Sequence, residues 1–438
     1  MDVMIIFKYI VIAALGGLGG VMANRGIAVF NDGFRPIVPQ YYDKQISRKE
    51  LAAMSFAISF GLVVGFGIPT SIAASVILIH CIFLATDIIG TFCPDNLVGT
   101  IISGVIGAVW GVLILVGLDG IVFLFNQLPF NFMGDLGKVS DFVIAAFAIF
   151  PAVAIGFQHG FKKGVIIGVI TVIVYMTIML FGKIPLPDGN NVVLNPAGIS
   201  LLVGCVFMII FAVTAKHEKT SANADLVNVF GEKVSRIRKN WPMLAVTGGL
   251  IACAASMSIL AGDPISMPLI SQGEYANAAL TALARAIGFV PLVFTTAIVT
   301  GVYGPAGCTF VFPIGIALTG NPILAFVCGV ACMVVELLLI NAFAKLMDKF
   351  PGIKDMGEHI RNAMNKVLEV ALIVGAVVSA EAMASNFKLT GVGALFIIGT
   401  LLLNRTSKKP IVEMAVGPVA CIFFGILLNI LAACHVVG

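Results

Sequence analysis

Three ionisable residues interrupt long apolar runs of this chain: Asp87, Arg285 and Glu336. A charged side chain near the centre of a lipid-spanning helix costs about 2.5–3.5 kcal/mol on insertion scales, so such residues are functional candidates. We expect Arg285 to attract an anionic group or pair with a carboxylate, Glu336 to exchange a proton or pair with Arg285, and Asp87 to help bind a cation or polar solute. The structural alternatives are an Arg285 that reaches the membrane interface, a buried ion pair at Glu336 and an interfacial Asp87.

A row of hydroxyls follows Arg285 along the same apolar run. Thr296, Thr300 and Tyr303 recur at helical spacing, and Thr295 is adjacent. Hydroxyls beside unwound backbone suit the coordination of Na⁺ or hydrogen bonding to a polar solute. We therefore predict that these four residues line a substrate site. The alternative is that each Thr hydroxyl bonds the backbone of its own helix.

Glycine and proline interrupt one apolar run in each half of the chain, 236 residues apart. The residues are Gly65, Gly67 and Pro69 in the first half and Gly301, Gly304 and Pro305 in the second. Unbonded backbone is tolerated at membrane depth only where it is buried in protein or lines a polar cavity, and paired helix breaks are typical of transporter sites. We predict two broken helices that face a common solute site. Ordinary short loops between spans are the alternative.

The composition determines the class of protein to which these residues belong. Hydrophobic residues make up 59% of the 438 positions and charged residues only 11%, against about 25% charged in a soluble protein. This excludes a soluble enzyme, a nucleic-acid-binding protein, a secreted disulfide scaffold and a disordered regulator. We predict an all-α polytopic membrane protein with twelve to fourteen transmembrane segments, some of them broken or re-entrant. The candidates are about 3–23, 51–68, 70–90, 97–117, 141–157, 164–181, 197–215, 242–261, 278–300, 305–320, 322–345, 366–384, 390–403 and 412–433.

The basic residues predict an orientation. Five loops contain 21 of the 26 Lys and Arg residues, and these loops are 24–50, 158–163, 216–241, 345–366 and 404–411. If the chain passes through the membrane fourteen times, all five loops lie on the same side. The positive-inside rule identifies that side as the cytoplasm. Both termini are then periplasmic or extracellular.

The longest polar stretch divides the chain into three parts. We predict an N-terminal membrane repeat over 1–215, a cytoplasmic basic linker over 216–241 and a C-terminal membrane repeat over 242–438. Each repeat holds about seven segments. Because that number is odd, the second repeat would be inverted in the membrane relative to the first.

Several stretches together resemble the YhfT family of bacterial inner-membrane proteins. They are Ala28–Ile37, Ser235–Pro242, Arg285–Tyr303 and Ile360–Leu372. The resemblance implies a multi-pass transporter in the inner membrane, and by analogy an elevator-like plan with a homodimer, but it names no substrate. One departure is Asn31, where the family pattern has a His before Asp-Gly, so a proton role at this loop is not expected.

We therefore expect an ion-coupled secondary transporter, or permease, that moves a small polar and preferably anionic solute by alternating access. Na⁺ or H⁺ is the expected coupling ion, and no metal, other cofactor or nucleic acid is expected to bind. The chain carries no GxxxxGK[ST] motif of an ATPase. The alternatives are a channel or a membrane subunit that depends on a partner and, less favoured, a membrane-embedded enzyme, which would need clustered His or carboxylate ligands.

Overall fold

The computed structural model describes residues 3–185, 191–215, 223–408, 410–411 and 413–437, and these are mostly helical. Nine helices in the described residues are long and apolar enough to cross a membrane, and three shorter apolar helices accompany them. The predicted all-α, multi-pass membrane protein is thereby confirmed. Lys216 and Lys219 of the predicted linker lie outside the described residues.

The helices of the first half are α1 (Val3–Asn24), α2 (Val38–Tyr42), α3 (Arg48–Leu62), α4 (Ile68–Ala74), α5 (His80–Phe92), α6 (Leu97–Gln127), α7 (Met133–His159), α8 (Phe161–Phe181) and α9 (Pro196–Thr214), with a 3₁₀ turn η1 (Arg35–Ile37) and a π-helical turn η2 (Val63–Gly67). Those of the second half are α10 (Asn223–Lys239), α11 (Trp241–Ser256), α12 (Met267–Ser271), α13 (Tyr275–Thr300), α14 (Val311–Ala317), α15 (Pro322–Lys349), α16 (Pro351–Ser385), α17 (Val392–Thr406) and α18 (Glu413–Ala433). Four short strands complete the fold: β1 (Ile77–Leu78), β2 (Lys183–Pro185), β3 (Asn191–Val193) and β4 (Leu260–Ala261).

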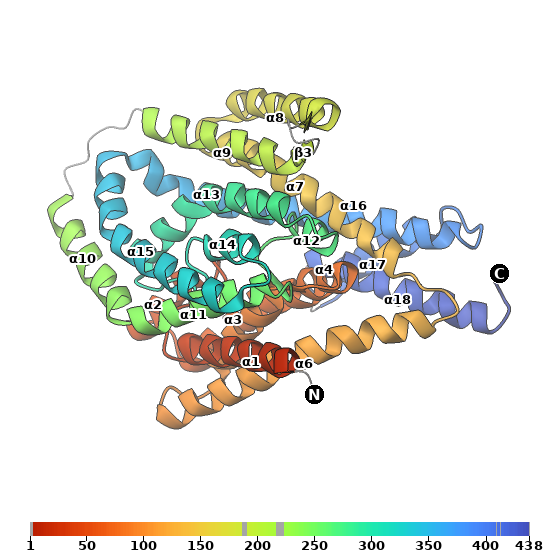
Figure 1. Ribbon diagram of the computed structural model, residues 1–438, viewed down its shortest axis with the longest axis horizontal. Helices are drawn as coiled ribbons and strands as arrows, with labels where there is room; N and C mark the ends of the chain where they lie inside the picture. Colours follow the sequence, from red (N-terminus) through yellow and green to blue (C-terminus); the bar gives the residue numbers. More distant parts are fainter. Residues whose placement is uncertain (1–2, 186–190, 216–222, 409, 412, 438) are drawn as a thin grey trace.

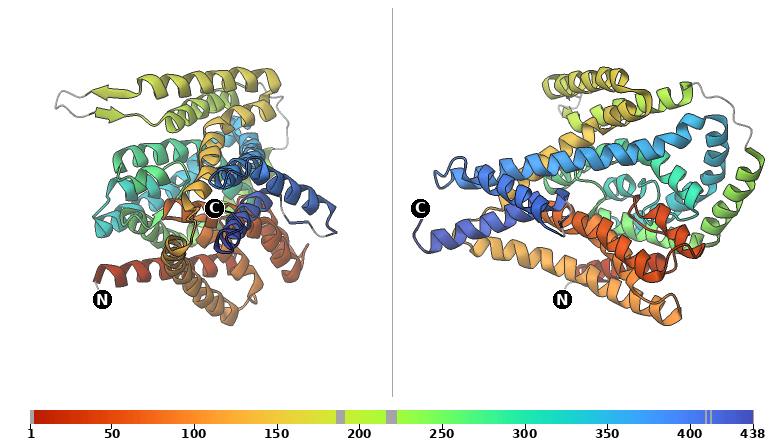
Figure 2. Two further views of the ribbon diagram at one scale, coloured as in Figure 1. Left: turned by 90° about the vertical axis from the view of Figure 1, so that its right-hand side faces the viewer. Right: turned by 180° about the vertical axis from the view of Figure 1, so that it is seen from behind.

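The helices pack in two groups. In one, α1 packs on α5 and α6 while α11 packs on α14 and α15. In the other, α7 packs on α8 and α9, α16 packs on α17 and α18, and α7 lies along α16. Figure 1 shows α10 at one end of the molecule and the C-terminus at the other, and Figure 2 shows the β2–β3 hairpin projecting beside α8 and α9.

Glycines bring two helix pairs into close contact. A Cβ on Gly16 of α1 would lie 2.1 Å from the carbonyl oxygen of Gly107 in α6. A Cβ on Gly329 of α15 would lie 2.6 Å from the carbonyl oxygen of Gly248 in α11. Small residues of this kind let membrane helices approach through their backbones, so both pairs are expected to be rigid.

Two of the predicted spans are not continuous helices. The predicted span 70–90 contains the end of α4, strand β1 and most of α5, and the predicted span 305–320 contains a loop and the seven-residue α14. Buried strands are as apolar as membrane helices, so hydropathy alone did not distinguish them. Val76 to Ile79 are all buried apolar residues.

The predicted helix break at Gly65, Gly67 and Pro69 is wrong. The helix that begins at Arg48 continues through η2 to Ala74 without a loop. Pro69 lacks an N–H group, and the wider π turn ahead of it accommodates that missing bond within the helix. The first half breaks instead at Ser75, which adopts a left-handed conformation with φ 54°.

The break at Gly301, Gly304 and Pro305 is present, because α13 ends at Thr300 with Gly301 in the left-handed conformation and no helix resumes before Val311. At the start of α3, a capping box joins Ser47 to Glu50, and the hydrogen bonds from Ser47 hold the pKa of the exposed Glu50 carboxyl below its ordinary value.

Segments from the two halves of the chain pair in parallel at two places. Each of these two strand pairings is called a crossing, which is distinct from the passage of a helix through the membrane. At the first crossing Ala28 pairs with Tyr303, and at the second crossing Ile77 pairs with Leu260. Each paired segment follows a residue in the left-handed conformation two positions earlier. These residues are Gly26 (φ 58°), Ser75 (φ 54°), Ser258 (φ 56°) and Gly301 (φ 70°).

Candidate functional site

A cavity of about 680 Å³ lies beside the first crossing, between the loop that follows α1, the helix α13 and the N-terminal part of α16. Four basic and two acidic side chains line it, and they are Arg35, Arg285, Arg361, Lys366, Asp32 and Glu369. Much of the remaining wall is aromatic and aliphatic. The cavity is thus an apolar space with a net positive lining.

Among the described residues that line the cavity, Arg285 is the most deeply buried cation that has no direct partner. It lies on α13 with 5% of its surface exposed, and it forms no hydrogen bond or direct ion pair within the described residues. Its guanidinium stacks over the ring of Phe289, 4.3 Å from the ring centroid. The carboxylates of Asp263 and Asp32 interact with it electrostatically. A buried guanidinium whose N–H groups make no direct contact with an acceptor is costly, so this position suits an anionic ligand.

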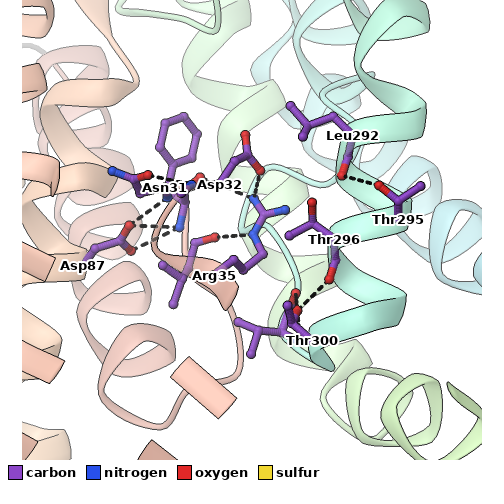
Figure 3. A network of polar contacts seen from close by, with 12 residues as sticks. Asn31, Asp32, Arg35, Asp87, Leu292, Thr295, Thr296 and Thr300 are labelled. Carbon is purple, nitrogen blue, oxygen red and sulfur yellow. Dashed lines mark hydrogen bonds and ion pairs between the residues drawn. The ribbon is translucent and has the colours of Figure 1, made fainter. Parts of the chain in front are cut away.

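Asp32 and Arg35 form an ion pair at the cavity wall, with 2.7 Å between the charged atoms. Arg35 also donates from Nε to the Val29 carbonyl over 3.0 Å and from a terminal nitrogen to the Phe30 carbonyl over 3.3 Å. The pair therefore fixes its own loop. In Figure 3 Arg35 points from this loop towards Thr296 on α13.

Asp87 lies on α5 behind the same loop. Its carboxylate accepts the N–H of Phe30 at 3.1 Å and the N–H of Asn31 at 2.9 Å (Figure 3). Asn31 in turn donates to Ser59 over 3.0 Å. Asp87 does not line the cavity. The structure thus gives Asp87 a positioning role, and its prediction as a substrate ligand gains no support.

Glu336 holds the other strand of the first crossing. It accepts the hydroxyl of Tyr303 at 3.0 Å and the N–H of Cys308 at 2.6 Å, and Cys332 donates to it over 3.7 Å. The pairing with Arg285, one of the two roles expected for Glu336, is not formed: within the described residues no ion pair joins them, and the carboxylates that act on Arg285 are Asp263 and Asp32. Tight packing of Gly307 against Glu336 keeps the carboxylate on the loop.

The predicted hydroxyl row does not reach the cavity. Thr295 donates to the Leu292 carbonyl over 3.3 Å and Thr300 to the Thr296 carbonyl over 2.7 Å, as in Figure 3. The Thr296 hydroxyl is buried without a partner in the described chain, and Tyr303 bonds Glu336. Of the seven predicted substrate-binding residues, the structure places only Arg285 at the cavity wall, and of the predicted break residues only Gly304.

Sequence reasoning gave little weight to two residues that line the cavity, His80 and Arg361, and it missed Asp263. Within the described residues, His80 Nδ1, Arg361 Nε and Asp263 Oδ2 are buried without hydrogen-bond partners. In the sequence, Arg361 has the pattern of an exposed charge at the beginning of a predicted span. Asp263 had a readable signal, because it is the only charged residue between Lys239 and Glu274.

The linker helix α10 caps the two helices that lead to the first crossing. Lys233 donates to the Val299 carbonyl at the end of α13, and Arg236 donates to the Gly26 carbonyl over 3.1 Å beyond the end of α1. Cations near helix C-termini stabilise the unpaired carbonyls and the helix dipole. The predicted basic linker is therefore in close contact with the membrane helices.

Comparison with known proteins places the chain in a family. The family model YhfT, described as a protein of unknown function, matches residues 8–437. This chain belongs to the YhfT family. It is 36% identical over 439 residues to the uncharacterized protein YhfT of Escherichia coli strain K12, covering 97% of both chains. No solved structure matches this YhfT-family protein significantly. Within the described residues, no group of three His, Cys, Asp or Glu side chains is placed to hold a metal ion.

Proposed function

We propose that this protein is an ion-coupled secondary transporter of a small anionic solute, driven by H⁺ or Na⁺ and working by alternating access. The observation that carries the proposal is the buried guanidinium of Arg285, which has no direct partner in the described chain and lines a cavity of about 680 Å³. A cavity of this size suits a small organic solute. Intramembrane ionisable groups commonly mark substrate pathways.

The packing of the helices supports two equivalent halves. The set α1, α5 and α6 corresponds to α11, α14 and α15, and the set α7, α8 and α9 corresponds to α16, α17 and α18. The helix formed by α3, η2 and α4 then corresponds to α13, which gives seven segments in each half. Two repeats that each contain an odd number of segments are inserted in the membrane in opposite orientations, as in many secondary transporters.

The two crossings give the correspondence residue by residue. Gly26 and Ser258 are 232 residues apart, as are the strand residues that follow each by two positions, Ala28 and Leu260. Ser75 and Gly301 are 226 residues apart, and the paired Ile77 and Tyr303 share that interval. Each crossing therefore joins one strand from each proposed repeat, which supports a pseudo-twofold relation through the centre of the protein.

The charge distribution supports the orientation. Arg361, Asn362 and Asn365 line the cavity and belong to the basic segment 345–366 at the junction of α15 and α16, which the positive-inside rule places on the cytoplasmic side of a bacterial inner membrane. The cavity would then face the cytoplasm, both termini would be periplasmic, and the described state would be inward-facing.

Uptake into proteoliposomes tests the proposal. Accumulation of small organic anions, with acetate, succinate and benzoate as probes, is measured with and without a H⁺ or Na⁺ gradient. We expect accumulation that depends on the gradient, its loss in Arg285→Gln, and its retention in the matched control Arg25→Gln, because Arg25 is exposed and outside the cavity. Flux that ignores both gradients would indicate a channel and would contradict the proposal.

A further inference from the structure

We propose that the cavity binds an organic anion whose charged oxygen headgroup sits on Arg285 and whose apolar, ring-sized body packs on the surrounding aromatic side chains. The inference deepens the proposed function by naming the class of solute. It concerns binding alone, so it can be tested without transport.

The charge balance favours an anion at Arg285. Asp32 lines the same cavity, but Arg35 already pairs with it at 2.7 Å. Asp263 does not line the cavity, and one of its oxygens accepts the N–H of Ser266 at 2.8 Å. Arg361, also on the wall, has a buried Nε with no partner in the described residues. Two cations of the wall therefore lack direct counterions, and charge-assisted hydrogen bonds to an anion would satisfy them.

The walls around Arg285 favour an apolar body on that anion. Phe289 stacks on the guanidinium itself, and its ring is stacked with that of Phe147 at 6.5 Å and edge-on to that of Phe150 at 5.7 Å between centroids. Phe30 and Phe66 line the cavity further along. A hydrated inorganic ion would lose water against these rings and gain no contact in return. An aromatic or aliphatic body would gain burial and stacking.

Two further polar groups would orient the ligand. Thr309 Oγ1 and His80 Nδ1 are buried at residues of the cavity wall, and neither has a partner in the described chain. The His80 ring is held edge-on between Phe30 and Phe66, at 5.0 and 5.1 Å between centroids. A few placed polar groups within apolar walls are the usual composition of an organic-ligand site.

Calorimetric titration of the purified full-length protein in detergent tests the inference with three probes. Benzoate carries both the charge and the ring, benzyl alcohol carries the ring without the charge, and inorganic phosphate carries charge without the ring. We expect saturable binding of benzoate, and at least tenfold weaker binding of both other probes. No saturable benzoate binding, or equal binding of benzyl alcohol or phosphate, would overturn the inference.

Variants locate the site. Arg285→Gln should weaken benzoate binding at least tenfold, or about 1.4 kcal/mol, whereas Arg285→Lys should retain part of it and Arg25→Gln all of it. Asp263→Asn should strengthen binding, because it removes a negative charge that acts on Arg285. Because misfolding would weaken benzoate binding, stronger binding by Asp263→Asn cannot be caused by misfolding. Unchanged benzoate binding in Arg285→Gln would place the ligand elsewhere.

The outcomes separate the two proposals. Benzoate binding that depends on Arg285, in a protein that accumulates no anion under any gradient, would uphold the inference and count against transport. Gradient-driven accumulation of acetate or succinate by a protein that does not bind benzoate would uphold transport and overturn the inferred solute class.

Discussion

The two crossings have the same backbone plan and different surroundings. At the second, Ile77 donates to the Ile259 carbonyl over 3.1 Å and Ile79 donates to the Ala261 carbonyl over 2.9 Å, and the segment is enclosed by apolar side chains. At the first, Tyr303 donates to the Ile27 carbonyl over 3.2 Å, and the ladder stops there on that side. The first crossing contributes Phe30, Asn31 and Gly304 to the wall of the cavity, whereas the second contributes only His80 among the described residues.

Proline explains why the ladder stops. Pro305 occupies the position that corresponds to Ile79, and it has no N–H to donate. The Val29 carbonyl, which corresponds to that of Ala261, therefore accepts from Arg35 instead. A single residue thus changes a closed strand pair into an anchor for a charged side chain. In the proposed mechanism this difference lets the cavity open at the first crossing while the second stays closed.

Asp87→Ala should cause the largest loss at the first crossing. It leaves the buried N–H groups of Phe30 and Asn31 without an acceptor, at about 1–3 kcal/mol each, so thermal unfolding in detergent should occur several degrees lower. Asp87→Asn retains an accepting oxygen and is the matched control. Equal melting of Asp87→Ala and the wild type would show that the carboxylate does not hold the loop.

Replacing Glu336 separates a structural role from a proton-handling role. Glu336→Ala removes the acceptor of Tyr303 and Cys308 and should cost about 2–4 kcal/mol of stability, while Glu336→Gln keeps an acceptor and should lose much less. We expect Glu336→Gln to retain gradient-driven uptake. Loss of uptake with unchanged melting would instead restore Glu336 as a coupling group.

A smaller effect is expected at the second crossing from Ser71→Ala. The Ser71 hydroxyl donates to the Gly67 carbonyl over 2.7 Å and accepts the N–H of Leu78 over 2.9 Å. Its removal leaves one buried N–H without an acceptor, against two at Asp87, and should cost about 1–3 kcal/mol, measured by thermal unfolding against Ser385→Ala as an exposed control. A loss as large as that of Asp87→Ala would mean that the two crossings do not differ as described.

Pro305→Ala should have the smallest effect on stability and should sharpen the comparison. The new N–H can bond the Val29 carbonyl and displace Arg35, which would make the first crossing resemble the second. We expect a stability change below about 1 kcal/mol and slower maleimide labelling of a cysteine placed at Thr309. Unchanged labelling would show that Pro305 does not keep the cavity open.

The sequence predicted the class of fold and two residues of the cavity wall, Arg285 and Gly304, and the reasons are specific. Arg285 was found because it is a lone cation in an apolar run, a signal that does not depend on tertiary structure. Gly65–Pro69 was taken for a break because glycine and proline spacing cannot distinguish a π turn from a loop. The helix actually breaks at Ser75, where there is no glycine, so the local residue types do not predict a left-handed conformation.

The hydroxyl row and the carboxylates show a different limit. Helical spacing correctly placed Thr296 and Thr300 on one face, but whether a threonine bonds a solute or its own helix depends on which neighbour packs there. Glu336 and Asp87 were correctly singled out as costly buried charges. Their partners include backbone N–H groups of distant loops, and these cannot be read from residue types.

Cysteine labelling from each side of the membrane tests the central claim most directly. In a chain whose nine native cysteines are replaced, single cysteines are placed at Thr309 in the cavity and at Ser266, which is buried beyond the second crossing. Alternating access predicts that an impermeant maleimide reaches Thr309→Cys only from the cytoplasmic side and Ser266→Cys only from the periplasmic side, with a solute that traps one state protecting the other position. Labelling of both cysteines from the same side would contradict the inverted-repeat account.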